Sequence, residues 1–235
     1  MSDNSLSVFN TSINISQVKH DHADAIWPVG VDICIARLPI RKRDGYTPEL
    51  MKTFAQRLKN SVSKNGIVYL ICYAPSEAKS RPFEVAKEMV EAGFTHIDNI
   101  IIEKTWLPGK RAENTLVNSH DYVLWFCNGN VWKIDREPLR KYLMLDEGAP
   151  CIGNTWLVET GSLDEAYSDD LAEILLRMAD CLPGSSVFDP FMSNSAIVRA
   201  CLKLGHSLSG FEMNDRKLAQ YTKIIDDFSK TRGSK

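Results

Sequence analysis

Short apolar, β-branched runs alternate along this chain with amphipathic helical segments, and this alternation constrains the fold more than any other feature. Strands separated by helices form a largely parallel sheet whose two faces the helices cover. The sequence therefore predicts an α/β fold, built as a single three-layer domain. The predicted strands are SINISQV (12–18), VDICIA (31–36), GIVYLICY (66–73), HIDNIII (96–102), DYVLWFC (121–127), SSVFDP (185–190) and SLSGFE (207–212).

The predicted helices place apolar residues three or four apart on one face. Thr47 and Pro48 form a cap and a first turn, Gly93 ends the second helix, and Asn214 caps the last one. Another helix follows the strand at 185–190. The apolar faces comprise Leu50, Phe54, Leu58 and Val62; Phe83, Ala86, Met89 and Val90; Leu171, Ile174, Leu175 and Met178; and Leu218, Tyr221, Ile224 and Ile225.

Composition sets the broad class. The chain has 235 residues, 44% of them hydrophobic and 25% charged, which suits one large α/β domain with a substantial core. We expect this domain at residues 13–228, between a disordered start at 1–12 and a disordered tail at 229–235. The absence of a membrane-length apolar run and of a signal-peptide pattern favours a soluble intracellular protein, cytoplasmic if the source is prokaryotic.

The net charge, the cysteines and the histidines argue against general attraction to nucleic acid, a disulfide framework and a metal site. The net charge of −2 gives no global attraction to nucleic acid, so any binding needs a local patch. The six cysteines form no C-x-x-C pair and lie beside apolar runs, which favours buried free thiols over a disulfide frame. His20 and His22 flank an aspartate in a polar stretch without a matching ligand cluster, so no metal site is predicted.

Two acidic residues end the last two predicted strands, in VFDPFMSNSA and SLSGFEMN. Ligands of parallel α/β sheets gather at the carboxyl ends of the strands. Asp189 leads through a turn of small residues into a helix, whose first N–H groups are free. Glu212 is placed to accept hydrogen bonds from a ribose diol. The alternative is that Asp189 merely caps the helix and Glu212 is an ordinary surface acid.

These stretches resemble motifs of the amino-methylating DNA methyltransferases (adenine N6 or cytosine N4) of the permuted, β-type order. VFDPFMSNSA is similar to that family's D-P-F-x-G-S-G-T, and GFEMNDRKLAQY is similar to its G-x-E segment. The stretch LLRMADCLPGSS resembles the helix and turn before the cofactor motif. His120-Asp121 stands where the family has a His-Glu pair. The resemblance covers about 31–221 of the chain.

The resemblance implies a mixed, mostly parallel seven-stranded sheet with S-adenosylmethionine at the carboxyl ends of its strands. The chemistry motif precedes the cofactor motif, which is a circular permutation of the commoner order. The implied cofactor-binding residues are Asp189, Phe191, Ser193, Ser195 and Glu212.

The cofactor turn departs from the family pattern at two positions. Ser193 and Ser195 replace glycines that allow positive φ and leave room beside the ligand. A serine in the left-handed conformation costs roughly 1 kcal/mol. We therefore expect binding of S-adenosylmethionine to be weakened or lost.

The chemistry motif departs further. The alignment places Arg37, Leu38, Pro39 and Ile40 where the family has D/N/S-P-P-Y/F/W, and only the proline is retained. In the family, the first residue and a proline carbonyl accept hydrogen bonds from the target amino group, and the aromatic residue stacks on the flipped base. A guanidinium has donors only, and isoleucine has no π face. No catalytic residue is assigned, and enzymatic activity stays open.

Basic residues follow the altered motif. Arg41, Lys42 and Arg43 predict a basic cluster at the mouth of the cleft, and Lys110 and Arg111 lie in a loop that the family places near its substrate. This cluster is either a phosphate-binding patch for DNA or a solvated loop. The interval at 128–164, where the family reads DNA sequence, is short. A protein partner would then supply recognition.

Three functions remain open on this sequence. The favoured one is a catalytically impaired, methyltransferase-like subunit that associates with DNA beside an active partner. The second is an active S-adenosylmethionine-dependent DNA methyltransferase with an altered site. The third is a non-enzymatic binding module that has lost the cofactor.

Overall fold

The computed structural model describes residues 3–8, 11–17, 25–39, 47–73, 79–103, 119–143, 152–158, 167–179 and 184–233. In this part of the chain, nine strands form one sheet in the order β1-β2-β9-β8-β3-β4-β6-β5-β7. Strands β2, β9, β8, β3 and β4 are mutually parallel, whereas β6 is antiparallel to β4 and β5. The sheet is therefore mixed but mostly parallel, as the sequence predicts.

The strands are β1 (Asp3–Val8), β2 (Thr11–Gln17), β3 (Val31–Arg37), β4 (Val62–Tyr73), β5 (Thr95–Glu103), β6 (His120–Cys127), β7 (Thr155–Leu157), β8 (Ser186–Asp189) and β9 (Ser207–Glu212). The helices are α1 (Pro48–Ser61), α2 (Arg81–Glu91), α3 (Glu137–Tyr142), α4 (Asp169–Met178), α5 (Ala196–Leu204) and α6 (Asp215–Gly233).

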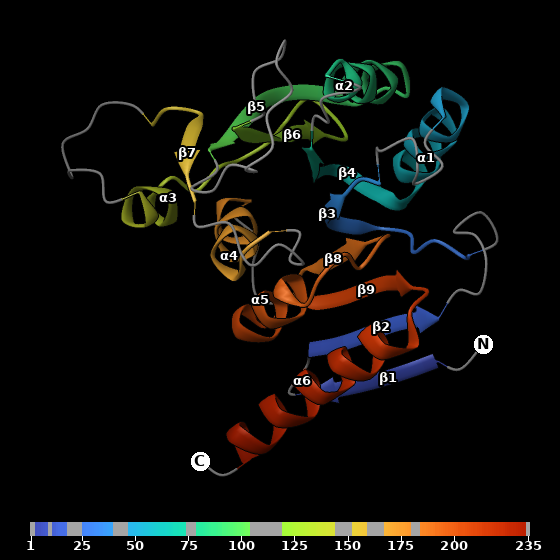
Figure 1. Cartoon of the computed structure of the whole chain (residues 1–235), viewed down its shortest axis with the longest axis vertical. Coiled ribbons are helices and arrows are strands. Elements are labelled where there is room, and N and C mark those ends of the chain that lie inside the picture. The colour runs from blue at the N-terminus through green and yellow to red at the C-terminus, as the bar shows by residue number, and fades with distance from the viewer. Residues whose placement is uncertain are drawn as a thin grey trace, which may run out of the picture.

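Helices cover both faces of the sheet and so complete the three layers (Figure 1). Helices α4, α5 and α6 share one hydrophobic core with the sheet, and α1 and α2 share the other. Successive residues of a strand face opposite cores: Ile33 and Ile35 pack on the α4–α6 side, and Cys34 and Ala36 on the α1–α2 side. Burial on both faces explains why residues 33–36 of β3 are all apolar.

The strand count differs from the seven that the sequence predicts, because β1 and β7 were not identified. Strand β1 lies in the segment expected to be disordered and pairs antiparallel with β2, from Asp3 opposite Ser16 to Val8 opposite Thr11. Its sequence DNSLSV has only two apolar residues, too few to identify a strand from the sequence. Strand β7 has three residues, too few for a periodic signal.

The start of α1 agrees with its local signal, whereas Val62, expected on the apolar face of this helix, is the first residue of β4. Thr47 accepts a hydrogen bond from the Leu50 N–H at 3.1 Å, as a cap should, and Pro48 begins α1. Helix α3 was not predicted, and α6 reaches Gly233, beyond the expected domain end at 228.

The predicted apolar face of α2 is wrong in part. Pro82, Val85 and Met89 are buried, whereas Phe83 and Val90 are 62% and 49% exposed. The buried residues Val85 and Met89 pack in the core that α1 and α2 share with the sheet.

Four cysteines, Cys34, Cys72, Cys127 and Cys201, are buried free thiols, as predicted. Cys151, Cys181 and His20–His22 lie outside the described residues. Within the described ranges, no helix is long and apolar enough to cross a bilayer, and no cluster of three potential metal ligands occurs.

Candidate functional site

The predicted cofactor acids meet at the carboxyl edge of the sheet. Strands β8 and β9 are parallel neighbours, with Asp189 opposite Gly210, so Asp189 and Glu212 end adjacent strands. Strand β3 lies on the other side of β8, with Cys34 opposite Phe188, and brings Arg37 to the same edge. The predicted cofactor motif and chemistry motif are therefore brought together by the sheet order.

Asp189 is fully buried, and among the described residues only one of its two carboxylate oxygens has hydrogen-bond partners. Its Oδ1 accepts hydrogen bonds from the N–H groups of Phe191 and Met192, at 2.9 and 3.0 Å. Its Oδ2 is buried and has no hydrogen-bond partner among the described residues. Burial raises the pKa of Asp189 from 3.8 to about 7, and the nearby carboxylate of Glu212 adds to this rise. The free oxygen can accept a donor or bind a cationic group.

Glu212 is fixed to the cofactor turn rather than exposed. It is 6% exposed, and its Oε1 accepts hydrogen bonds from the N–H groups of Met213 and Asn214, both at 2.8 Å. The hydroxyl of Tyr221 lies 3.2 Å from Glu212 Oε2 and 2.6 Å from the carbonyl oxygen of Met192. Burial and the charge of Glu212 raise the pKa of Tyr221. The reading of Glu212 as an ordinary surface acid is therefore wrong.

The backbone of the turn differs from the sequence expectation. Met192 has a φ of 37°, and within the described part of the turn Ser193 and Ser195 do not adopt positive φ. Ser195 is helical, with φ −81° and ψ −6°. The predicted left-handed cost at the two serines is therefore absent, because Met192 makes the left-handed step instead.

Gly210 lies directly against the turn after β8, where a larger residue would not fit. A Cβ added to Gly210 would lie 2.5 Å from Met192 Sδ and 2.7 Å from the carbonyl oxygen of Asp189. The second contact is with backbone, which a rotamer change cannot relieve. Gly210 therefore allows β9 and the turn after β8 to approach closely.

We expect Gly210→Ala to lower the free energy of unfolding by about 2–3 kcal/mol, the range for overpacked cores. Urea denaturation of both proteins measures this change. Gly153→Ala is the control, because a Cβ at Gly153 meets nothing within 4 Å. Equal stabilities for the two variants would show that the turn adjusts without cost.

Tyr167 and Asn194 belong to this site, and the sequence reading missed both. The Asn194 side-chain amide donates to the carbonyl oxygen of Tyr167 at 2.6 Å, and its Oδ1 accepts from the Ala196 N–H at 3.0 Å. Burial raises the pKa of Tyr167, and the nearby charge of Asp189 raises it further. The segment before α4 is thus joined to the turn. In the sequence, the one indication of this contact is the identity of Asn194, because asparagine often caps helices.

The remaining turn residues contact neighbouring helices. Phe191 stacks on Phe54 of α1, with ring centroids 5.4 Å apart. The Ser195 hydroxyl accepts a hydrogen bond from Arg199 Nη1 at 2.7 Å, and the same guanidinium pairs with Asp169 at the start of α4. The serine in place of glycine thus links the turn to α4 and α5.

The altered chemistry motif lies partly within the described residues. Arg37 is half-buried opposite Ile71, and its side chain has no hydrogen-bond or ionic partner in the described ranges. Leu38 is 6% exposed and donates its N–H to the carbonyl oxygen of Ile71 at 3.1 Å, and Pro39 is exposed. The other predicted residues, Ile40, Arg41, Lys42, Arg43, Lys110 and Arg111, lie outside the described residues.

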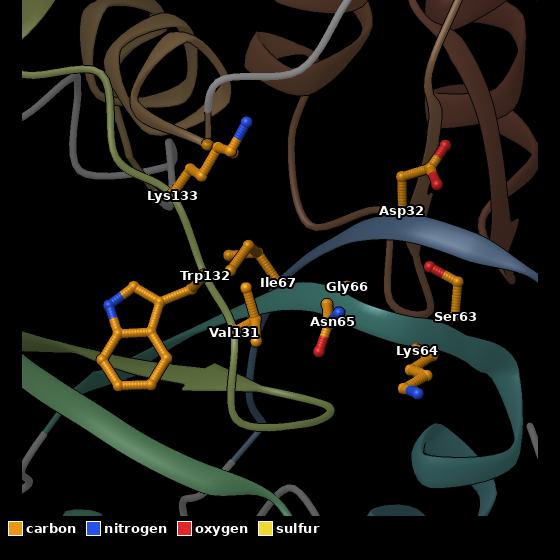
Figure 2. Close-up of a pocket in the computed structure, with 10 residues that line it drawn as sticks. Asp32, Ser63, Lys64, Asn65, Gly66, Ile67, Val131, Trp132 and Lys133 are labelled. Carbon is orange, nitrogen blue, oxygen red and sulfur yellow. The ribbon is translucent and has the colours of Figure 1, made fainter.

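A hollow of about 290 Å³ lies at the opposite edge of the sheet. Figure 2 shows that Asp32 and residues 63–67, at the amino ends of β3 and β4, line it together with residues 131–133. Asp32 is engaged there, since its Oδ2 accepts from both the N–H and the hydroxyl of Ser186, each at 2.9 Å. The hollow is therefore separate from the Asp189–Glu212 site.

Comparison with known proteins finds the same fold in several solved structures. The PvuII cytosine-N4-specific DNA methyltransferase superposes with a TM-score of 0.68 at 13% identity, over 95% of this chain and 93% of its own. TTHA0409 from Thermus thermophilus, in complex with S-adenosyl-L-methionine, gives 0.66 at 14%, over 91% and 93%. The M1.HpyAVI–SAM complex gives 0.62 at 18%, over 83% and 89%. No curated protein matches the chain.

The sheet order and these superpositions define the fold of the S-adenosylmethionine-dependent methyltransferases. A family model for N6 and N4 methyltransferases, described as DNA methylase, matches residues 42–223. The protein belongs to this DNA methylase family, which confirms the resemblance read from the sequence.

Proposed function

We propose that this protein is a catalytically impaired member of its family that associates with DNA and acts beside an active partner subunit. The observation that carries the proposal is Arg37 at the end of β3, the position to which the sequence alignment assigns the family's hydrogen-bond acceptor. A guanidinium has five donors and no acceptor, so it cannot orient the lone pair of a target amino group. Its charge also opposes the positive charge that develops on that nitrogen.

The expected loss of rate is large. Removing one preorganised electrostatic contact costs about 10²- to 10³-fold in rate, and reversing its sign costs more. Arg37 is half-buried, so water screens its charge incompletely. A partner with an intact motif would supply the chemistry in a complex.

We also propose that S-adenosylmethionine still binds, more weakly than in relatives with the two glycines. Asp189, Phe191, Ser193, Ser195 and Glu212 would hold it. The buried, unpaired Asp189 Oδ2 suits the ammonium of its amino-acid part, and Glu212 suits the ribose. Serines without positive φ remove part of the expected penalty. When bound, this cofactor supplies an electrophilic methyl group.

DNA is the proposed macromolecular ligand, because the protein belongs to a DNA methylase family. Arg41, Lys42, Arg43, Lys110 and Arg111 would contact phosphates. The interval at 128–164 contains only the short elements α3 and β7 among its described residues. We therefore assign sequence recognition to a protein partner, in an intracellular complex.

Two assays of the purified chain test this proposal. Incubated with labelled S-adenosylmethionine and DNA, the chain alone should transfer no methyl group. Calorimetric titration should nevertheless detect cofactor binding. Methylated DNA would contradict the impairment and favour the active enzyme. Absence of heat and of a thermal shift at millimolar ligand would favour a binding module without cofactor.

A further inference from the structure

An aromatic side chain stands exposed at the carboxyl edge of the sheet. Phe83 lies in the first turn of α2, the helix that follows β4, and is 62% exposed. Its ring contacts Tyr122 edge to face, with centroids 6.1 Å apart and planes at 61°. Tyr122 is opposite Cys72, the second-last residue of β4, so both rings lie at the edge where the motifs meet.

The support beneath Phe83 continues to a third ring. His120 Nε2 lies 3.0 Å from the Tyr122 hydroxyl, and the two ring centroids are 4.9 Å apart. Tyr122 is half-buried against the α1–α2 core. Tyr122 is therefore held in place next to Phe83. Because the Phe83 ring already packs against Tyr122, stacking a base on its exposed face would cost little additional side-chain entropy.

An exposed lysine precedes Phe83 in the sequence. Lys79, four residues before Phe83, is exposed and has no partner in the described ranges. Arg81 is bound to Glu84 at 3.1 Å. Lys79 is therefore a cation, four residues before Phe83 in the sequence, that is available for a phosphate contact.

We propose that Phe83, supported by Tyr122 and His120, is a stacking platform for an unpaired base of a DNA strand, with Lys79 contacting the adjacent phosphate. The inference rests on the proposed DNA association and names the form of DNA that the site takes. In the sequence alignment an isoleucine, which has no π face, replaces the family's stacking residue, so an unstacked base would need another aromatic surface. Stacking on an aromatic ring accepts any base and therefore needs no sequence-reading segment.

The chain offers matched controls. Val90 is an exposed apolar residue of the same helix, at 49%. Trp132 is an exposed aromatic residue, at 40%, beside the hollow at the opposite edge of the sheet (Figure 2). Val90→Ala tests general loss of apolar surface on α2, and Trp132→Ala tests general loss of exposed aromatic surface.

The experiment measures binding of the full chain to a fluorescein-labelled single-stranded oligonucleotide by anisotropy. Phe83→Ala should weaken binding about 10-fold or more, within the range for one stacked base. Phe83→Trp should restore it, and both controls should bind like the unaltered protein. A 2-aminopurine base in the strand should be quenched by the unaltered protein and much less by Phe83→Ala. Thermal unfolding verifies that each variant is folded.

The outcomes separate this inference from the function on which it rests. Absence of DNA binding by the unaltered protein would overturn both. DNA binding that Phe83→Ala leaves unchanged, or that Trp132→Ala weakens equally, would overturn the stacking platform and leave DNA association intact. Equal affinity for fully paired duplex and for the single strand would also overturn it, because a paired base is unavailable for stacking.

Discussion

Asp189→Asn should weaken S-adenosylmethionine binding by about 100-fold without unfolding the protein. The asparagine Oδ1 can still accept the two turn N–H groups that Asp189 Oδ1 accepts now. Its amide nitrogen, however, replaces the buried unpaired Oδ2 and brings a donor where the proposed ligand brings an ammonium. The substitution removes a charge-assisted hydrogen bond to the ligand and leaves a buried amide donor without an acceptor. Both effects lower the affinity.

Calorimetric titration of the two proteins measures this effect. Glu103→Gln is the control, because Glu103 ends β5 at the same edge of the sheet but is exposed and is not on β8 or β9. It should change affinity little. An Asp189→Asn affinity within threefold of the unaltered protein would refute the role of Asp189 in cofactor binding.

The free energy of unfolding should also depend on the ionisation of Asp189. Its pKa is raised from 3.8 to about 7 in the fold, first by burial. Between these values the unfolded chain is ionised while the folded protein keeps its proton. The contribution of Asp189 is therefore complete below about pH 4, falls as pH rises, and is lost above pH 7. Three pH units correspond to about 4 kcal/mol.

Urea denaturation from pH 4 to 8 tests this expectation. Other groups titrate in the same interval: burial lowers the pKa of His206, so its contribution falls in the opposite direction, as pH decreases below about 6.5. Asp189→Asn isolates the aspartate, because asparagine stays neutral throughout. The variant should gain stability relative to the unaltered protein as pH rises from 4 to 8. Parallel pH profiles would mean that folding does not raise the pKa of Asp189.

The two predictions together describe one property of the site. An unpaired oxygen on a buried acid is unfavourable in the free protein, and a cationic ligand removes the cost. If S-adenosylmethionine binds as proposed, the stability given up at Asp189 would be recovered on binding, and the affinity for the cofactor would depend on pH.

The local signals in the sequence determined the order of elements, the location of the acids and the family. Strand and helix periods, the Thr47-Pro48 start of α1 and the motif around Asp189 all depend on neighbouring residues. Each of these signals can be identified within a single segment. Strands β1 and β7 lack such signals, because each is defined by its pairing with another strand, β2 and β5 respectively.

Only the tertiary structure decided how the site is held. Tyr167 and Tyr221 reach the turn from distant segments, and no local pattern marks a tyrosine as the neighbour of a buried acid. Met192, and neither serine, has the positive φ, and its side chain lies against Gly210 on another strand. Burial and long-range contacts set these features and the raised pKa of Asp189, because desolvation is a property of the assembled fold.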